Sequence, residues 1–199
     1  MIISHKHKFI MVMVPRTGSR SMQKSLEGWS DEVAKRHHQG LLSLKWDYSD
    51  YFTAAFVRNP WDKAISFYEW FKKKGRIYEG AYSLKIDARR WPFSQFVEAI
   101  ETGLWKRPED GRMPFAKMHS HGYCRGVQNV YKYEKLPQEW QRLCDDVGFS
   151  LAKPLPHIGK SKRRNFYKYF KSQKTIDRVA KVFEKDIELY GYKVPQFKI

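Results

Sequence analysis

Short apolar runs alternate with amphipathic segments along most of the chain. Residues 9–14 and 51–57 are continuous apolar or aromatic runs with β-branched side chains, the pattern of buried parallel strands. A third strand is expected over residues 127–133, and residues 33–36 form a weaker candidate that ends in two histidines. These runs predict the strands of one sheet.

Helical spacing follows each of the main runs. After the first run, Met22, Leu26 and Trp29 recur at helical intervals and predict a helix of about three turns. After the second run, Asn59 can cap a helix that has Pro60 at its first position. Further helices are expected over residues 41–46, 61–74, 93–100 and 138–147, and a long last one over 176–190.

Strands that alternate with helices are typical of the α/β class. We expect a three-layer sandwich with a central, mostly parallel sheet, built as a single domain over residues 1–199. Ligands of such folds bind beyond the carboxyl ends of the strands. The turns that follow Val14 and Val57 are therefore the expected site.

The first of these turns has the composition of an anion-binding loop. Residues 14–21 read Val-Pro-Arg-Thr-Gly-Ser-Arg-Ser, so a buried strand leads into a tight turn and then into a helix. Backbone N–H groups at such a turn, with the positive end of the helix, attract a phosphate or sulfate. The loop is not a Walker A motif, because it lacks the Gly-Lys-Ser/Thr ending.

Composition points to an anionic ligand. The chain has 38 Lys and Arg residues against 21 Asp and Glu, a net charge of +17. Its two cysteines, Cys124 and Cys144, lack metal-ligand spacing and are expected to be reduced thiols. We see no signal peptide and no run long enough for a membrane span, so a cytoplasmic location is expected.

The two turns together resemble the signature pair of the sulfotransferases that use 3′-phosphoadenosine 5′-phosphosulfate (PAPS). Residues 14–21 are similar to the family's loop for the 5′-phosphosulfate, and residues 56–68 to its segment for the 3′-phosphate. Weaker matches cover residues 131–136 and 186–192, in family order. The resemblance is strongest to the group of carbohydrate 2-O-sulfotransferases and their small bacterial and phage relatives.

The resemblance implies a P-loop NTPase-like sulfotransferase fold and a transferase activity. A sulfuryl group would pass in line from PAPS to an acceptor hydroxyl, with carbohydrate as the expected acceptor and 3′-phosphoadenosine 5′-phosphate (PAP) as the product. An anionic glycan would suit the positive charge. The family needs no metal for this transfer, and we expect neither a nucleic-acid partner nor a membrane span.

The resemblance also assigns site residues. The catalytic set comprises Arg16, where the family usually has lysine, and a histidine base, for which His38 aligns slightly better than His37. The donor-binding set comprises Arg16, Thr17, Gly18, Ser19, Arg20, Ser21, Arg58, Ser66, Lys160 and Arg164. Arg58 and Ser66 would share the 3′-phosphate.

Two other functions stay open at this point. A P-loop-like nucleotide kinase or hydrolase would need magnesium, and no strand-end aspartate is evident for it. A basic nucleic-acid or polyanion-binding module would account for the charge and for the 16% aromatic content, but it does not need the Pro-Arg-Thr-Gly-Ser turn. The sequence does not identify the acceptor or the oligomeric state.

Overall fold

The computed structural model describes residues 1–29, 31–33, 38–74, 91–102, 118–150, 155–156, 158 and 165–197. The chain forms two compact units. Unit 1 comprises Met1–Arg58 and Ser120–Lys160, and unit 2 comprises Asn59–His119 and Ser161–Ile199. Each unit has its own hydrophobic core.

Unit 1 contains a five-stranded sheet in the order β3-β1-β2-β4-β5. Strands β2 (Phe9–Val12), β4 (Phe52–Val57) and β5 (Asn129–Lys132) run parallel to one another. They correspond to the three expected apolar runs, and with the helices they confirm the α/β class. The carboxyl ends of β2 and β4 meet at one edge of the sheet, since Val12 is the register partner of Ala55.

The other part of the sheet is antiparallel, which the sequence analysis did not predict. Strand β1 (Ile2–Ser4) forms a hairpin with β2, and β3 (Glu32–Val33) pairs with the far side of β1. Three residues are too few to display a periodicity, so β1 has no signal of its own. The sheet is therefore mixed, with its parallel part at β2, β4 and β5.

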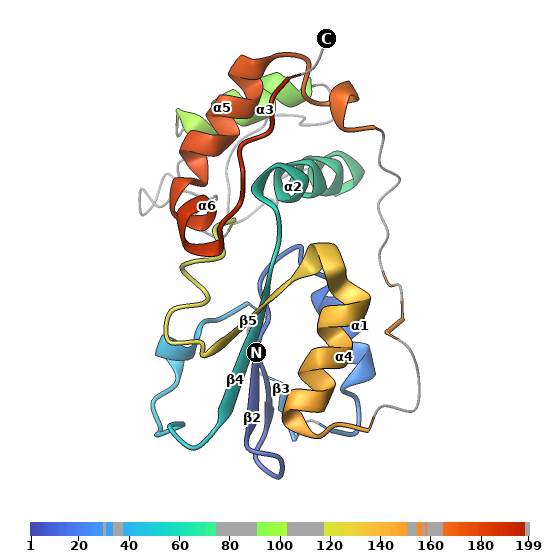
Figure 1. Ribbon diagram of the computed structural model, residues 1–199, viewed down its shortest axis with the longest axis vertical. Helices are drawn as coiled ribbons and strands as arrows, with labels where there is room; N and C mark the ends of the chain where they lie inside the picture. The colour runs from blue at the N-terminus through green and yellow to red at the C-terminus, as the bar shows by residue number, and fades with distance from the viewer. Residues whose placement is uncertain are drawn as a thin grey trace. The chain divides into compact units, whose positions relative to one another are not determined.

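Helices α1 (Ser19–Ser25) and α4 (Leu136–Val147) cover one face of this sheet (Figure 1). Short 3₁₀ turns lie at η1 (Leu41–Ser43) and η4 (Tyr133–Lys135). The core joins alternate residues of the strands to the apolar faces of the two helices. Its members include Phe9, Met11, Phe56, Tyr131, Met22, Leu26, Trp140 and Leu143.

Unit 2 is helical in the part that the structure describes. It contains α2 (Pro60–Lys74), α3 (Phe93–Glu101), α5 (Gln173–Val182), α6 (Glu184–Tyr190) and the 3₁₀ turn η5 (Phe166–Lys168). The predicted cap of α2 is present, because Asn59 Oδ1 accepts hydrogen bonds from the backbone N–H groups of Trp61 and Asp62 at 3.1 and 3.3 Å.

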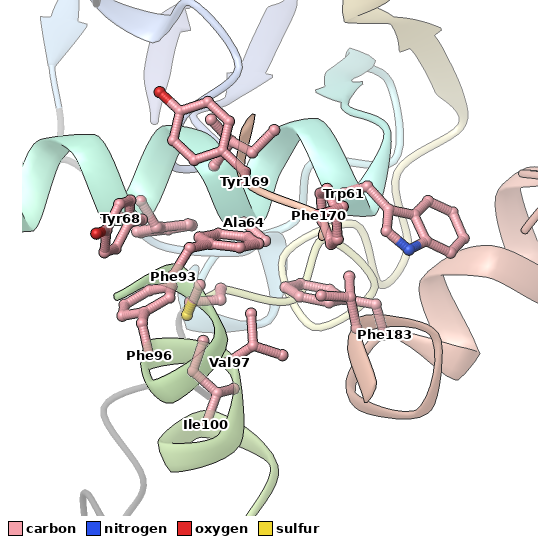
Figure 2. Close-up of a cluster of buried hydrophobic side chains, with 14 of the residues drawn as sticks. Trp61, Ala64, Tyr68, Phe93, Phe96, Val97, Ile100, Tyr169, Phe170 and Phe183 are labelled. Carbon is pink, nitrogen blue, oxygen red and sulfur yellow. The ribbon is translucent and has the colours of Figure 1, made fainter. Parts of the chain in front are cut away.

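Aromatic side chains dominate the core of unit 2. Figure 2 shows Tyr68 of α2 beside Phe93 and Phe96 of α3, with Trp61 and Phe183 farther along the cluster. The polar atoms of the large rings have partners: Trp61 Nε1 donates to the Ile176 carbonyl at 3.0 Å, and Tyr68 Oη donates to the Trp91 carbonyl at 2.6 Å. These bonds allow a tryptophan and a tyrosine to lie in an apolar core.

Three helices differ in length from the prediction, and the one expected over residues 41–46 is only the 3₁₀ turn Leu41–Ser43. The expected long helix over residues 176–190 is broken at Phe183, which leaves helical geometry (φ −107°, ψ 21°) and is buried in the core of unit 2. Helix α1 spans seven residues and ends before Leu26. No helix among the described residues is long and apolar enough to cross a membrane.

Candidate functional site

The turn after β2 is held by the backbone carbonyl of Val14. This oxygen accepts hydrogen bonds from Thr17 Oγ1 at 2.8 Å and from Ser19 Oγ at 2.9 Å. All three residues are buried. Since a hydroxyl carries one proton, the Thr17 and Ser19 hydroxyls fix the turn and do not donate to a ligand in this geometry. The sequence analysis placed Thr17 and Ser19 in the donor-binding set, and their hydroxyl protons are engaged within the turn instead.

Two residues of the turn have left-handed backbone conformations. Gly18 has φ +84°, which glycine adopts at little cost. Arg16 has φ +66°, which is uncommon for a side-chain-bearing residue and stores strain. Strain of this kind is kept where the surrounding structure enforces it, and here it lies at the predicted catalytic cation.

Four successive backbone N–H groups of this turn have no hydrogen-bond acceptor among the described residues. The N–H groups of Ser21 and Met22 bond to the Gly18 carbonyl and begin α1. Those of Thr17, Gly18, Ser19 and Arg20 donate to no group among the residues that the structure describes. Successive unbonded N–H groups that lead into the first turn of a helix are the elements of an anion-binding loop.

Ser21 links this loop to a distant part of unit 1. Its Oγ accepts a hydrogen bond from the backbone N–H of Ile158 at 3.0 Å. Because the serine oxygen is the acceptor here, its own proton stays on the hydroxyl as a donor. Residue 158 precedes the basic run 160–164 by two positions in the sequence.

Arg58 follows β4 and reaches the same loop. Its side chain is 2% exposed, and Nη1 donates to the backbone carbonyl of Arg16 at 2.7 Å. Its Cζ lies 4.2 Å from the centre of the Tyr133 ring, a cation–π contact. The turns after the two parallel strands are therefore joined through one guanidinium group.

Positive charge accumulates at the loop. Burial and repulsion from Arg58 and then Arg20 lower the pKa of Arg16 to about 10. Arg16 stays protonated at neutral pH, so the loop presents several cations close together. A bound anion would relieve this repulsion.

The predicted base His38 lies near the same strand end. Its Nδ1 is 2.6 Å from the backbone carbonyl of Met13. A carbonyl can only accept, so Nδ1 carries the proton, and the basic lone pair of the neutral ring is on Nε2. The ring centre of His38 lies 6.5 Å from that of Tyr123.

Unit 1 thus brings together most of the predicted site residues. Arg16, Thr17, Gly18, Ser19, Arg20, Ser21 and Arg58 belong to one loop and its support, with His38 on the Met13 carbonyl. Ser66 lies in α2 of unit 2 and is buried, at 1% exposure. His37, Lys160 and Arg164 lie outside the described residues.

The loop after β2, at the carboxyl end of the parallel strands, has the features of an anion-binding loop. The description "Sulfotransferase family" belongs to the family model that matches residues 1–193. The chain therefore belongs to the sulfotransferase family. No curated protein sequence matches the chain.

Sequence reasoning missed how the loop is supported. Tyr133 belongs to the third stretch of family resemblance, yet nothing in its spacing indicated that it contacts Arg58. The sequence also did not predict that the Met13 carbonyl is the partner of His38, because every residue type has a backbone carbonyl. Only the identity of Arg58 at the end of an apolar run indicated its place.

Proposed function

We propose that the protein transfers a sulfuryl group from PAPS to an acceptor hydroxyl, and that PAP is the second product. Membership of the sulfotransferase family gives the reaction class. The observation that carries the choice of donor is the loop at residues 16–20, which has cations at both ends and whose N–H groups from Thr17 to Arg20 bond to none of the described residues. A phosphosulfate needs such a combination of donors and charge.

The loop would hold the 5′-phosphosulfate. In this proposal the N–H groups of Thr17 to Arg20 bind its oxygens, and the Ser21 hydroxyl donates to one of them. Arg16 stabilises the negative charge that develops on the bridging oxygen of the leaving nucleotide. Arginine keeps its proton more firmly than the family's usual lysine, so Arg16 would act as an electrostatic group and not as an acid.

Arg58 and Ser66 would anchor the 3′-phosphate, with Lys160 and Arg164 closing over the nucleotide. Arg58 is already fixed by its bond to the Arg16 carbonyl, so little side-chain freedom remains to be lost on binding. Lys160 is a candidate because Ile158, two positions earlier, bonds to Ser21 of the loop.

His38 would be the base, with His37 as the alternative. The acceptor oxygen forms a bond to sulfur while the bond from sulfur to the bridging oxygen breaks, and PAP leaves with that oxygen. The acceptor proton passes to His38 Nε2, the nitrogen that bears the lone pair when Nδ1 donates to Met13. Positioning and electrostatics supply the rest of the rate enhancement.

We propose a carbohydrate of the kind accepted by 2-O-sulfotransferases as the acceptor. We further propose that the protein is a cytoplasmic, small bacterial or phage-type member of the family. The net charge of +17 favours an anionic glycan over a neutral one. We also propose that residues 1–199 form a single sulfotransferase domain.

Nucleotide binding tests the donor. We would titrate the protein with PAP, ATP and AMP by calorimetry, with and without magnesium. We expect PAP to bind at least about tenfold more tightly than AMP, because only PAP carries the 3′-phosphate for Arg58. Transfer of ³⁵S from labelled PAPS to a panel of glycans then identifies the acceptor.

The other two functions give different results in the same titration. A kinase or hydrolase would prefer ATP and would need magnesium to bind it. A polyanion-binding module would show no preference among the nucleotides and would bind polynucleotides with a steep salt dependence. Either outcome would contradict the proposed sulfuryl transfer from PAPS.

A further inference from the structure

Tyr133 lies where the two strand-end turns of unit 1 come together. It begins η4, directly after β5, and its side chain is half-buried. Strand β5 is the parallel neighbour of β4, with Val57 paired to Lys132. This pairing places Tyr133 beside Arg58, because each follows its paired residue by one position.

One face of the Tyr133 ring carries the Arg58 guanidinium. The distance from Arg58 Cζ to the ring centre is 4.2 Å. A buried guanidinium loses solvation, so contact with the negative face of an aromatic ring compensates part of that loss. The ring therefore helps to keep Arg58 charged and in place while Nη1 donates to the Arg16 carbonyl.

The edge of the same ring contacts the loop. A Cβ built on Gly18 would lie 3.2 Å from Tyr133 Cε2, with Leu136 Cδ2 at 3.5 Å and Met22 Cε at 3.7 Å. Tyr133 thus closes the space beside the glycine whose φ of +84° shapes the loop. One residue contacts both the loop and the arginine that supports it.

We propose that Tyr133 is a positioning residue for donor binding, whose aromatic ring holds the Arg58 guanidinium and the Gly18 turn at a fixed separation. The inference rests on the proposed function for the identity of the donor. Its physical content is that the ring matters and the phenol hydroxyl does not. Tyr133 acts through Arg58 and Gly18, without touching the reacting atoms.

Two substitutions separate the ring from its other properties. Tyr133→Phe keeps the aromatic face and removes the hydroxyl. Tyr133→Met keeps a long apolar side chain against Gly18 and removes the aromatic face. If the Met variant does not fold, Tyr133→Leu is used in its place. Tyr48→Met is the matched control, since Tyr48 is a half-buried tyrosine in the loop before β4.

The measurements are the dissociation constants for PAP and AMP and the NMR signal of the Arg58 side-chain Nε–H. We expect Tyr133→Phe and Tyr48→Met to bind PAP like the unsubstituted protein. Tyr133→Met should bind PAP about tenfold more weakly and lose most of the preference for PAP over AMP. The Arg58 signal, assigned by its absence in Arg58→Gln, should have a ring-current shift that Phe retains and Met abolishes.

Each alternative result has a defined meaning. Equal losses in Tyr133→Phe and Tyr133→Met would show that the hydroxyl contacts the ligand, and would overturn the positioning role. Undiminished PAP preference in Tyr133→Met would overturn it as well. If the unsubstituted protein binds no PAP, the proposed function fails, and the Arg58 signal in the Phe and Met variants still decides whether the ring positions the guanidinium.

Discussion

The side chain of Arg58 hydrogen-bonds to the backbone of Arg16, with 2.7 Å between Nη1 and the carbonyl oxygen. The bond spans 42 residues of sequence and connects the turns after β2 and β4. Because Arg16 has a left-handed backbone at φ +66°, an external partner is needed to keep its peptide in that orientation. Arg58 therefore supports the loop besides adding charge to it.

Replacing Arg58 should weaken donor binding even when the charge is kept. Arg58→Lys retains a cation, but an ammonium group lacks the planar fork that bonds to the Arg16 carbonyl and stacks on Tyr133. We expect PAP affinity to fall about tenfold to a hundredfold, equivalent to roughly 1.4–2.8 kcal/mol. Calorimetric titration with PAP measures this change.

Arg142→Lys is the control for Arg58→Lys. Arg142 also lies over a tyrosine ring, with Cζ 5.4 Å from the centre of Tyr131, but its side chain on α4 is 66% exposed. Its replacement should leave PAP affinity unchanged. An equal loss in both variants would mean that the weaker binding does not depend on the particular contacts of Arg58.

Gly18→Ala should cost both stability and binding. The alanine would have to adopt the φ of +84° that Gly18 has, and its methyl group would lie 3.2 Å from Cε2 of the Tyr133 ring. Gly28→Ala has the same backbone problem at φ +91° with nothing within 4 Å, so it isolates the conformational cost of about 1–2 kcal/mol.

Urea unfolding of the two alanine variants separates the cost of the positive φ from the cost of the contact with Tyr133. Gly28→Ala should lose only the conformational cost and keep its PAP affinity, whereas Gly18→Ala should lose more stability and most of its affinity. Equal destabilisation of the two variants, with equal PAP binding, would show that the contact between residue 18 and Tyr133 is not tight.

The pattern of residues was sufficient to predict the parallel strands and the loop. Residues 9–14 and 51–57 are long enough apolar runs to identify buried strands, and the parallel topology alone then places Arg16 and Arg58 at one edge. What the sequence could not give is how side chains and backbone interact across the edge. The Tyr133 ring under Arg58 is one example, and the Met13 carbonyl at His38 is another.

Backbone conformation was also beyond sequence reasoning. Nothing in residue type predicts that Arg16 has a positive φ, because only tertiary contacts enforce it. The break at Phe183 has a similar origin. Residues 176–190 have continuous helical periodicity, yet burial of the Phe183 ring in the core of unit 2 accompanies a local departure from helical angles.

Arg16→Gln should stabilise the unliganded protein while impairing binding. Burial and the charges of Arg58 and Arg20 lower the pKa of Arg16 to about 10, so the charged form is disfavoured in the folded state. Removing the charge relieves this cost. We expect a small gain, up to about 1 kcal/mol because the side chain is only half-buried, together with weaker PAP binding.

The pH dependence of this gain follows from linkage. At neutral pH Arg16 is protonated in both folded and unfolded states, and the full cost is present. As pH rises through about 10 the folded protein releases the proton before the unfolded chain does, so the cost and the advantage of Arg16→Gln both shrink. Melting temperatures of the variant and the unsubstituted protein at pH 7 and pH 10 measure this change. A stability gain of Arg16→Gln that grows with pH would contradict the lowered pKa of Arg16 as its cause.

Cys144 should react slowly with thiol reagents in the folded protein. Its burial, and secondarily Asp145, raise the pKa of the thiol to about 11. At pH 8 only about one thiol in a thousand is then ionised, and the side chain is buried in the core of unit 1. Cys124→Ser leaves Cys144 as the one thiol for titration with Ellman's reagent. Rapid reaction before denaturation would contradict the raised pKa.

His38→Asn tests the base with the least disturbance to its surroundings. The asparagine amide N–H₂ can replace Nδ1–H as the donor to the Met13 carbonyl, but it offers no basic nitrogen. We expect kcat to fall by about 10²–10⁴ with PAP affinity unchanged. The rise in rate across the pH range where a histidine deprotonates should disappear as well. His7→Asn, in the β1–β2 turn, should retain both rate and pH profile; a His38→Asn enzyme that does the same would exclude His38 and leave His37 as the candidate.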